Sequence, residues 1–133
     1  MSKQDAPAVI PWAFRQIRKL YRSSPESYLS LLKRQAQRDE WIYQFFAAHE
    51  LGTIYETFPE EVLAELRTLT GSDVEIVREG CATSWSKILS EDFEVGYEIL
   101  RNLQQNGSYE ERYTAAIAPV KFYKNDNNAS QRE

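Results

Sequence analysis

One stretch of the sequence decides the fold class: TFPEEVLAELRTLTG, at residues 57–71. Its proline suits the first turn of a helix, its two glutamates favour the positive end of the helix dipole, and its glycine is a stop signal. Its apolar side chains recur at the spacing of one helical face: Val62, Leu63, Leu66 and Leu69. We therefore expect a helix that begins near Pro59, packs one face on a core and stops at Gly71.

Similar start and stop signals lie on both sides of this stretch. Residues 23–26 read Ser-Ser-Pro-Glu, which combines a serine cap, a proline for the first turn and a glutamate for a capping box. Ser108 and Glu111 repeat the capping pattern, and Ser90 is expected to cap a helix that ends at residues 106–107. The first helix is expected to start near Pro11, where apolar and basic residues begin to alternate at helical spacing.

Three segments are harder to assign. Residues 25–49 read as one long helix, although the polar middle at residues 33–40 could also break it near Arg38. Residues 72–80 alternate like a strand, but a Ser72–Glu75 capping box and a stop at Gly80 favour a short helix. Pro119 should end the last helix, which leaves residues 120–123 as a short extended segment.

The composition supports a single helical domain. Hydrophobic residues make up 42% of the 133 residues, which is enough for a core, whereas 5 glycines and 5 prolines are too few for the turns of a β-sandwich or barrel. We expect an all-α, compact bundle of about five to six helices over residues 12–123. Residues 1–11 are expected to form a flexible lead-in, and residues 124–133 a flexible tail.

Cysteine usage and hydropathy bear on the compartment. Cys81 is the only cysteine, so the chain cannot form an internal disulfide or a cysteine-based metal cluster. No apolar run approaches the roughly 20 residues that cross a bilayer, and no signal peptide follows the first methionine. We expect an unanchored, cytoplasmic protein that makes no contact with a membrane.

Catalysis is not expected from this sequence. Nucleotide-binding glycine motifs and the H-E-x-x-H zinc motif are absent. His49 is the only histidine, and its place near a helix end suits the helix dipole without any catalytic role. Cys81 has no partner base that the sequence can assign. We therefore expect neither an enzyme nor a metal or cofactor site.

Charge is strongly segregated along the chain although the net charge is only −4. Between Trp12 and Arg38 there are seven basic residues and one acid, Glu26. Between Asp39 and Glu111 there are sixteen acids and four basic residues. Such segregation gives a dipolar surface that can steer charged partners or pair with itself.

The basic segment is the one candidate binding site for nucleic acid. A hairpin of the first two helices could place its cationic side chains on one surface: Arg15, Arg18, Lys19, Arg22, Lys33, Arg34 and Arg38. Contacts of this kind to a phosphate backbone are independent of base sequence and sensitive to salt. The function predicted from them is that of a non-catalytic accessory subunit that binds macromolecules, within a larger ribonucleoprotein or DNA-processing assembly.

Three other interpretations remain open. The basic residues could form a solvated face without a binding role, whose charge the acidic remainder of the molecule balances. They could contact the acidic edge of a second copy and build rows or filaments. Small helical subunits that line up along a nucleic acid in ribonucleoprotein effectors combine both binding modes, an analogy at the level of fold alone. Finally, the acidic body at residues 39–111 could dock a basic protein as an adaptor or inhibitor, through Glu91, Glu94 and Glu98.

Overall fold

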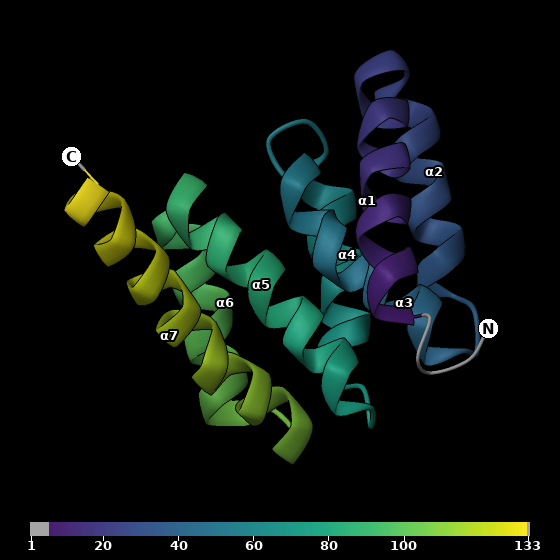
Figure 1. Cartoon of the computed structure of the whole chain (residues 1–133). Coiled ribbons are helices and arrows are strands. Elements are labelled where there is room, and N and C mark those ends of the chain that lie inside the picture. The colour runs from purple at the N-terminus through teal and green to yellow at the C-terminus, as the bar shows by residue number, and fades with distance from the viewer. Residues whose placement is uncertain (1–5, 133) are drawn as a thin grey trace.

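The computed structural model consists of helices throughout the part of the chain that it describes (Figure 1). It describes the backbone of residues 6–132 and, among the side chains, those of residues 12–125 except at positions 14 and 17. The elements are α1 (Ala6–Ser23), α2 (Pro25–Ala36), α3 (Trp41–Leu51), the 3-10 turn η1 (Gly52–Ile54), α4 (Pro59–Thr70), α5 (Glu75–Glu91), α6 (Phe93–Asn106) and α7 (Tyr109–Arg132). No strand occurs among these residues, so the predicted all-α class is confirmed. None of the described helices has the length and apolarity that crossing a membrane requires.

Helix α5 forms the centre of the fold. It packs against α3, η1, α4, α6 and α7, and Trp85 and Ile88 on it are fully buried. Small side chains along α5 let its neighbours come close: a Cβ atom on Gly80 would lie 3.1 Å from the Cβ atom of Ala48 on α3. Close helix packing of this kind excludes larger residues at the contact.

Buried hydroxyl groups form hydrogen bonds that join α5 and α7 to their neighbours. The backbone N–H of Gly52 donates to Ser84 Oγ at 2.8 Å, and Ser84 Oγ in turn donates to the carbonyl oxygen of Ala48. Trp85 Nε1–H donates to Thr70 Oγ1 at 3.0 Å, and Thr114 Oγ1 on α7 donates to the Thr70 carbonyl oxygen at 3.0 Å. These bonds satisfy buried polar groups that would otherwise destabilise the fold.

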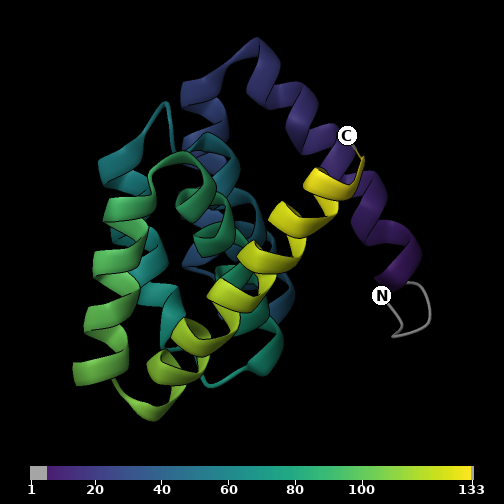
Figure 2. The same cartoon turned by 90° about the vertical axis from the view of Figure 1, so that its left-hand side faces the viewer.

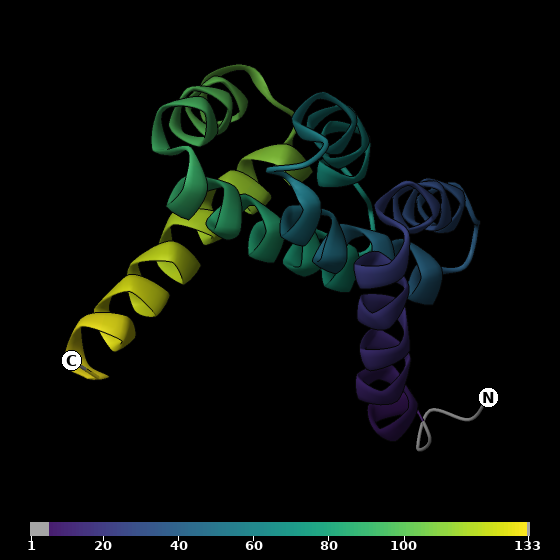
Figure 3. The ribbon, with the colours of Figure 1, turned by 90° about the horizontal axis from the view of Figure 1, so that it is seen from above.

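The helices leave one side of α5 concave. α4 and α6 lie on one side of α5, whereas α1 and α7 both project toward the other side, as Figure 3 shows from above. Figure 2, turned by 90°, shows both helices extending to the same side of the body. α3 and α7 flank α5 along its length, and α1 lies beyond α3. The concave side is therefore bounded by α1 and α7 and has α5 as its floor.

Local start signals are confirmed at several helices. Pro25 and Pro59 open α2 and α4, Ser24 caps α2 by accepting from the Ser27 N–H, and α4 ends before Gly71. Ser108 and Glu111 form the predicted reciprocal capping box, with bonds of 3.1 and 2.9 Å. These signals act within a few residues, so the sequence displays them directly.

The prediction of one long helix over residues 25–49 is wrong. The chain turns at residues 37–40, all of them exposed, and α3 folds back on α2. The break near Arg38, the alternative interpretation, is what occurs. Because residues 37–40 bring no apolar side chain to a core, packing of α3 on α2 stabilises the protein more than a continued helix would.

The boundaries predicted inside α5 and α6 are also wrong. Gly80 lies in the middle of α5 because its missing side chain makes room for α3. Ser72 accepts a hydrogen bond from the Val74 N–H in place of the expected capping box. Ser90 donates to the Ser86 carbonyl oxygen inside α5, and Asp92 occupies the N-cap position of α6.

At the two ends of the chain, helices extend beyond the predicted limits. α1 begins at Ala6, which places residues 6–11 of the predicted lead-in within a helix, while residues 1–5 lie outside the described residues. α7 continues through Pro119, so residues 120–123 are helical and not extended, and residues 124–132 continue the same helix. Packing on both sides of the proline, by Ala115, Ala118 and Phe122, offsets the roughly 3 kcal/mol that proline costs in a helix.

The contact between η1 and α5 yields a test of the fold. A Cβ atom on Gly52 would lie 2.7 Å from the Cα atom of Ser84, which is backbone and cannot move aside. We expect Gly52→Ala to lower the free energy of unfolding by about 2 kcal/mol in urea titrations. Gly71→Ala is the matched control, because a Cβ atom there meets side chains and no backbone atom: Glu111 at 3.3 Å and Ser108 Oγ at 3.9 Å. Equal stability of the two variants would contradict the tight contact.

Candidate nucleic-acid interface

Helix α1 carries an exposed basic row along one of its faces. Arg15, Lys19 and Arg22 are four and three residues apart, so they lie along one face, and all three are exposed. None of them forms an ion pair with another described residue. Their charges therefore face solvent and are available to a polyanion.

The C-terminal half of α1 attaches to the body. The rings of Tyr21 and Tyr28 pack with their centroids 5.2 Å apart, and the Tyr21 hydroxyl lies 3.1 Å from Thr57 Oγ1. The N-terminal half diverges from α2 toward the concave side (Figure 3). As a result, the basic row begins at the body and continues along the projecting part of α1.

Arg18, a fourth predicted nucleic-acid contact, is engaged inside the protein. Its Nε–H donates to Glu50 Oε1 at 3.3 Å, and the Glu50 side chain is completely buried. The hydroxyl of Tyr28 donates to the same oxygen at 3.2 Å, and His49 Nδ1 lies 3.1 Å from the other oxygen, Oε2. A buried carboxylate needs such partners, because burying it alone would cost several kcal/mol.

The charges around Glu50 shift the pKa values of the groups involved. Burial alone would raise the pKa of Glu50, but the hydrogen bond from His49 and the charges of Arg18, His49 and Lys87 outweigh it and lower that pKa. Burial, followed by the charge of Glu50, raises the pKa of the Tyr28 hydroxyl. Burial also lowers the pKa of Lys87, which extends from α5 toward this group. Glu50 is thus held in its charged form.

The basic residues of α2 and the following turn lie apart from the Glu50 cluster. Lys33 and Arg34 border a shallow depression on the outer face of α2, together with Glu26. Arg38 is engaged locally: its Nε lies 3.7 Å from Glu40 Oε2, and its guanidinium stacks 4.1 Å above the ring of Tyr43. Of the seven predicted residues, Arg18 and Arg38 therefore have partners within the chain.

The concave side contains basic residues that the sequence analysis missed. Two adjoining depressions, of about 720 and 430 Å³, share Thr83 on α5 and Lys121 on α7. Lys121 Nζ lies 3.5 Å from Glu79 Oε2, and Lys124, one turn further along α7, lines the second depression. The sequence analysis missed these two lysines because Pro119 predicted that the helix ends before them. Since α7 continues past Pro119, Lys121 and Lys124 lie on one face of it.

The two residues considered for catalysis, His49 and Cys81, both contact other parts of the protein. His49 borders the larger depression and contacts Glu50 as described. Cys81 is fully buried, and burial raises the pKa of its thiol to about 12, so the reactive thiolate is scarce at neutral pH. Within the described residues, no cluster of three or more histidine, cysteine or acidic side chains could hold a metal ion.

The acidic residues predicted for the adaptor interpretation lie at the far end from α1 (Figure 1). Glu91 ends α5, and Glu94 and Glu98 follow on α6, one turn apart; all three are exposed. Burial, followed by the nearby charge of Glu56, raises the pKa of Glu91. Negative charge therefore gathers at the junction of α5 and α6.

No protein-family model, curated protein or solved structure shows significant similarity to this chain.

The Glu50 cluster yields a prediction on stability. Glu50→Gln removes the charge that Arg18 and Lys87 face, and we expect the free energy of unfolding to fall by about 2 kcal/mol at neutral pH. The loss stays below the 3–5 kcal/mol typical of broken buried pairs, because Arg18 is half exposed and water can solvate it. Glu94→Gln, on the exposed surface, is the matched control and should change stability by less than about 0.5 kcal/mol.

The same variant shows a defined pH dependence. Because folding lowers the pKa of Glu50, its charge stabilises the protein fully above the ordinary value of 4.5 and progressively less as the pH falls through the folded value. The difference between Glu50→Gln and the parent protein should therefore shrink below pH 4.5. A difference that stays constant down to the acid unfolding transition would show that the carboxylate charge is not the cause.

Proposed function

We propose that this chain is a non-catalytic accessory subunit that binds a nucleic-acid backbone along its concave side. The observation that carries the proposal is the presence of cations on both helices that bound this side: three are exposed on α1, and on α7 the exposed Lys124 lies one turn from the half-buried Lys121, which pairs with Glu79. Arg15, Lys19 and Arg22 lie on α1, and Lys121 and Lys124 lie on α7. A phosphate backbone passing over α5 would meet positive charge on each side.

The electrostatics of the concave side favour a polyanion. Two acids near its floor are already paired with a cation: Glu50 with Arg18, and Glu79 with Lys121. Glu75, which also lines the larger depression, accepts a hydrogen bond from the Tyr113 hydroxyl. The acids of the adaptor interpretation lie elsewhere, at the junction of α5 and α6. The negative net charge of the whole chain therefore does not oppose binding at this surface, since screening confines the effect of distant charges to about 10 Å.

An exposed aromatic residue supports a single-stranded ligand. Trp12 precedes Arg15 and Lys19 by three and seven residues, so it shares their face of α1, and its side chain is 57% exposed. Bases of a single strand stack on such rings, whereas paired bases in a duplex cannot. We infer a preference for single-stranded nucleic acid, bound through phosphates and stacking with little dependence on base sequence.

The assignment to the cytoplasm belongs to this proposal. Cys81 is a free, buried thiol, which is compatible with a reducing compartment. Because this subunit is proposed to be non-catalytic, any catalytic step of its assembly would belong to another subunit.

The experiment that tests the proposal is fluorescence anisotropy of labelled oligonucleotides at several salt concentrations. Combined Arg15→Gln, Lys19→Gln and Arg22→Gln removes three phosphate contacts, so we expect at least about tenfold weaker binding at low salt. The slope of log affinity against log salt should fall by about 2, at roughly 0.7 for each contact on a single strand. Trp12→Ala should reduce the preference for single strands over duplex.

The matched control changes the same number of charges elsewhere. Arg67 and Arg101 are exposed on α4 and α6, which lie on the other side of α5, and Arg112 is exposed near the start of α7, where it donates to the Gly107 carbonyl oxygen. Their change to Gln should leave the salt slope unaltered. Equal loss of binding in the two triple variants would show that net charge, and not this surface, governs binding. Absence of binding by the parent protein at low salt would refute the proposal.

A further inference from the structure

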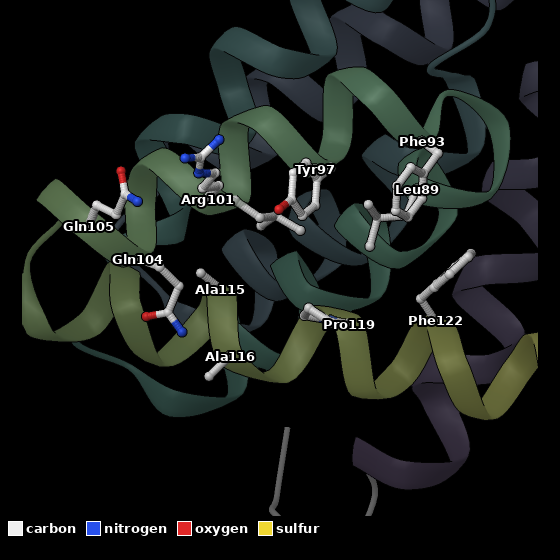
Figure 4. A pocket seen from close by; sticks show the side chains of 11 residues that line it. Leu89, Phe93, Tyr97, Arg101, Gln104, Gln105, Ala115, Ala116, Pro119 and Phe122 are labelled. Carbon is white, nitrogen blue, oxygen red and sulfur yellow. The ribbon is translucent and has the colours of Figure 1, made fainter.

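A groove on the surface between α6 and α7 is almost entirely apolar (Figure 4). Its volume is about 570 Å³, and it is lined by Phe93 and Tyr97 on α6 and by Pro119 and Phe122 on α7. The Phe93 and Tyr97 side chains are 52% and 48% exposed although they stack on each other with centroids 5.7 Å apart. Half-exposed aromatic residues around an apolar groove are typical of a surface that another molecule covers.

Helix α6 carries charges in a defined order beside this groove. Four residues follow one another at intervals of four, three and four, so they lie along one face of the helix: Glu94, Glu98, Arg101 and Gln105. All four side chains are exposed, and none forms an ion pair with another described residue. Arg101 and Gln105 also line the groove. The row is therefore acidic in its first half and has a cation and an amide in its second half.

This order of charges is complementary to itself when two copies of α6 lie antiparallel. The centre of such a pair falls midway between Glu98 and Arg101, because turning the row end to end exchanges these two positions. Glu98 of each copy then lies opposite Arg101 of the other, and Glu94 lies opposite Gln105. In a parallel pair, each glutamate would instead face the same glutamate of the other copy, and like charges would repel. The charges therefore favour the antiparallel arrangement.

We propose that α6 and its groove form the interface of a two-fold symmetric dimer, in which α6 packs antiparallel on α6 of a second copy. Phe93 and Tyr97 of each copy are covered at the centre of the contact, and the opposite charges of Glu98 and Arg101 meet at its edge. A two-fold contact uses the same surface on both copies, so the assembly closes at two chains.

The dimer goes beyond the proposed function because it leaves the concave side open. On α7 the groove is lined by residues three positions apart, Ala116, Pro119 and Phe122. Lys121 and Lys124 line the depressions of the concave side and lie on another face of the same helix. The dimer thus requires no nucleic acid, and its interface contains none of the cations proposed to contact phosphates.

The apolar part of this interface is small, so dimer and monomer should be in equilibrium. A fully covered aromatic side chain buries about 150–250 Å², so the half-exposed Phe93 and Tyr97 of two copies contribute roughly 400 Å². Standard stable interfaces bury about 1,200–2,000 Å² in total. The charged edge adds a dependence on salt. The dimer should therefore form at high protein concentration and dissociate on dilution or at high salt.

The first experiment is sedimentation velocity of the full chain, without nucleic acid, from about 5 to 500 µM. We expect the average mass to increase and to level off at twice that of the monomer. Ala116→Arg places a charge at an exposed position in the groove and should shift dimerisation to at least about tenfold higher concentration. Ala64→Arg, at an exposed position on α4, is the matched control and should change nothing. A monomer at all concentrations, growth beyond a dimer, or equal association of the two variants would overturn the proposal.

Charge reversal tests the antiparallel pairing itself. Glu98→Arg sets like charges opposite each other at two symmetric positions, and so does Arg101→Glu, so each variant alone should dimerise roughly tenfold more weakly. Mixing the two variants brings two cations opposite two acids, and the mixture should associate as strongly as the parent protein. A mixture that associates no better than either variant alone would contradict the pairing.

Nucleic-acid binding separates this proposal from the previous one. Ala116→Arg and Ala64→Arg add the same charge, and both positions lie outside the concave side, so the two variants should bind oligonucleotides equally. Loss of the dimer in Ala116→Arg with unchanged oligonucleotide binding is the expected result. Weaker oligonucleotide binding by Ala116→Arg than by Ala64→Arg would contradict the independence of the two surfaces.

Discussion

The buried carboxylate of Glu50 is the constraint on which the arrangement of the N-terminal half depends. Four helices meet at it: α1 through Arg18, α2 through Tyr28, α3 through His49 and Glu50 itself, and α5 through Lys87. A buried charge without partners would cost more than most single packing contacts contribute, so α1 must cross the body where Arg18 can reach Glu50. That requirement turns the side chains of Arg15, Lys19 and Arg22 toward solvent.

The sequence predicted those parts of the fold that depend on neighbouring residues, and missed those that depend on distant ones. Pro25, Pro59 and the Ser108–Glu111 box act within one turn, and they mark helix starts correctly. Gly80 and Pro119 are stop signals locally, but contacts with α3 and α5 from distant parts of the chain keep both within helices. Tertiary packing overrides local propensity at such positions.

The candidate site was predicted in part for the same reason. The basic row of α1 follows from helical spacing alone, whereas nothing local indicates that Arg18 pairs with Glu50, 32 residues away. Lys121 and Lys124 were missed because their alignment depends on α7 continuing past Pro119.

The position of the basic row depends most on Glu50, which fixes the direction of α1. Double electron–electron resonance tests it with spin labels at Gln16→Cys on α1 and Thr68→Cys on α4, both exposed, while the native Cys81 is buried and remains unlabelled. At low protein concentration the account predicts one narrow distance distribution in the otherwise unchanged protein and a broad one when Glu50→Gln is added. The same narrow distribution in both would contradict it, because α1 would then be held by its other contacts alone.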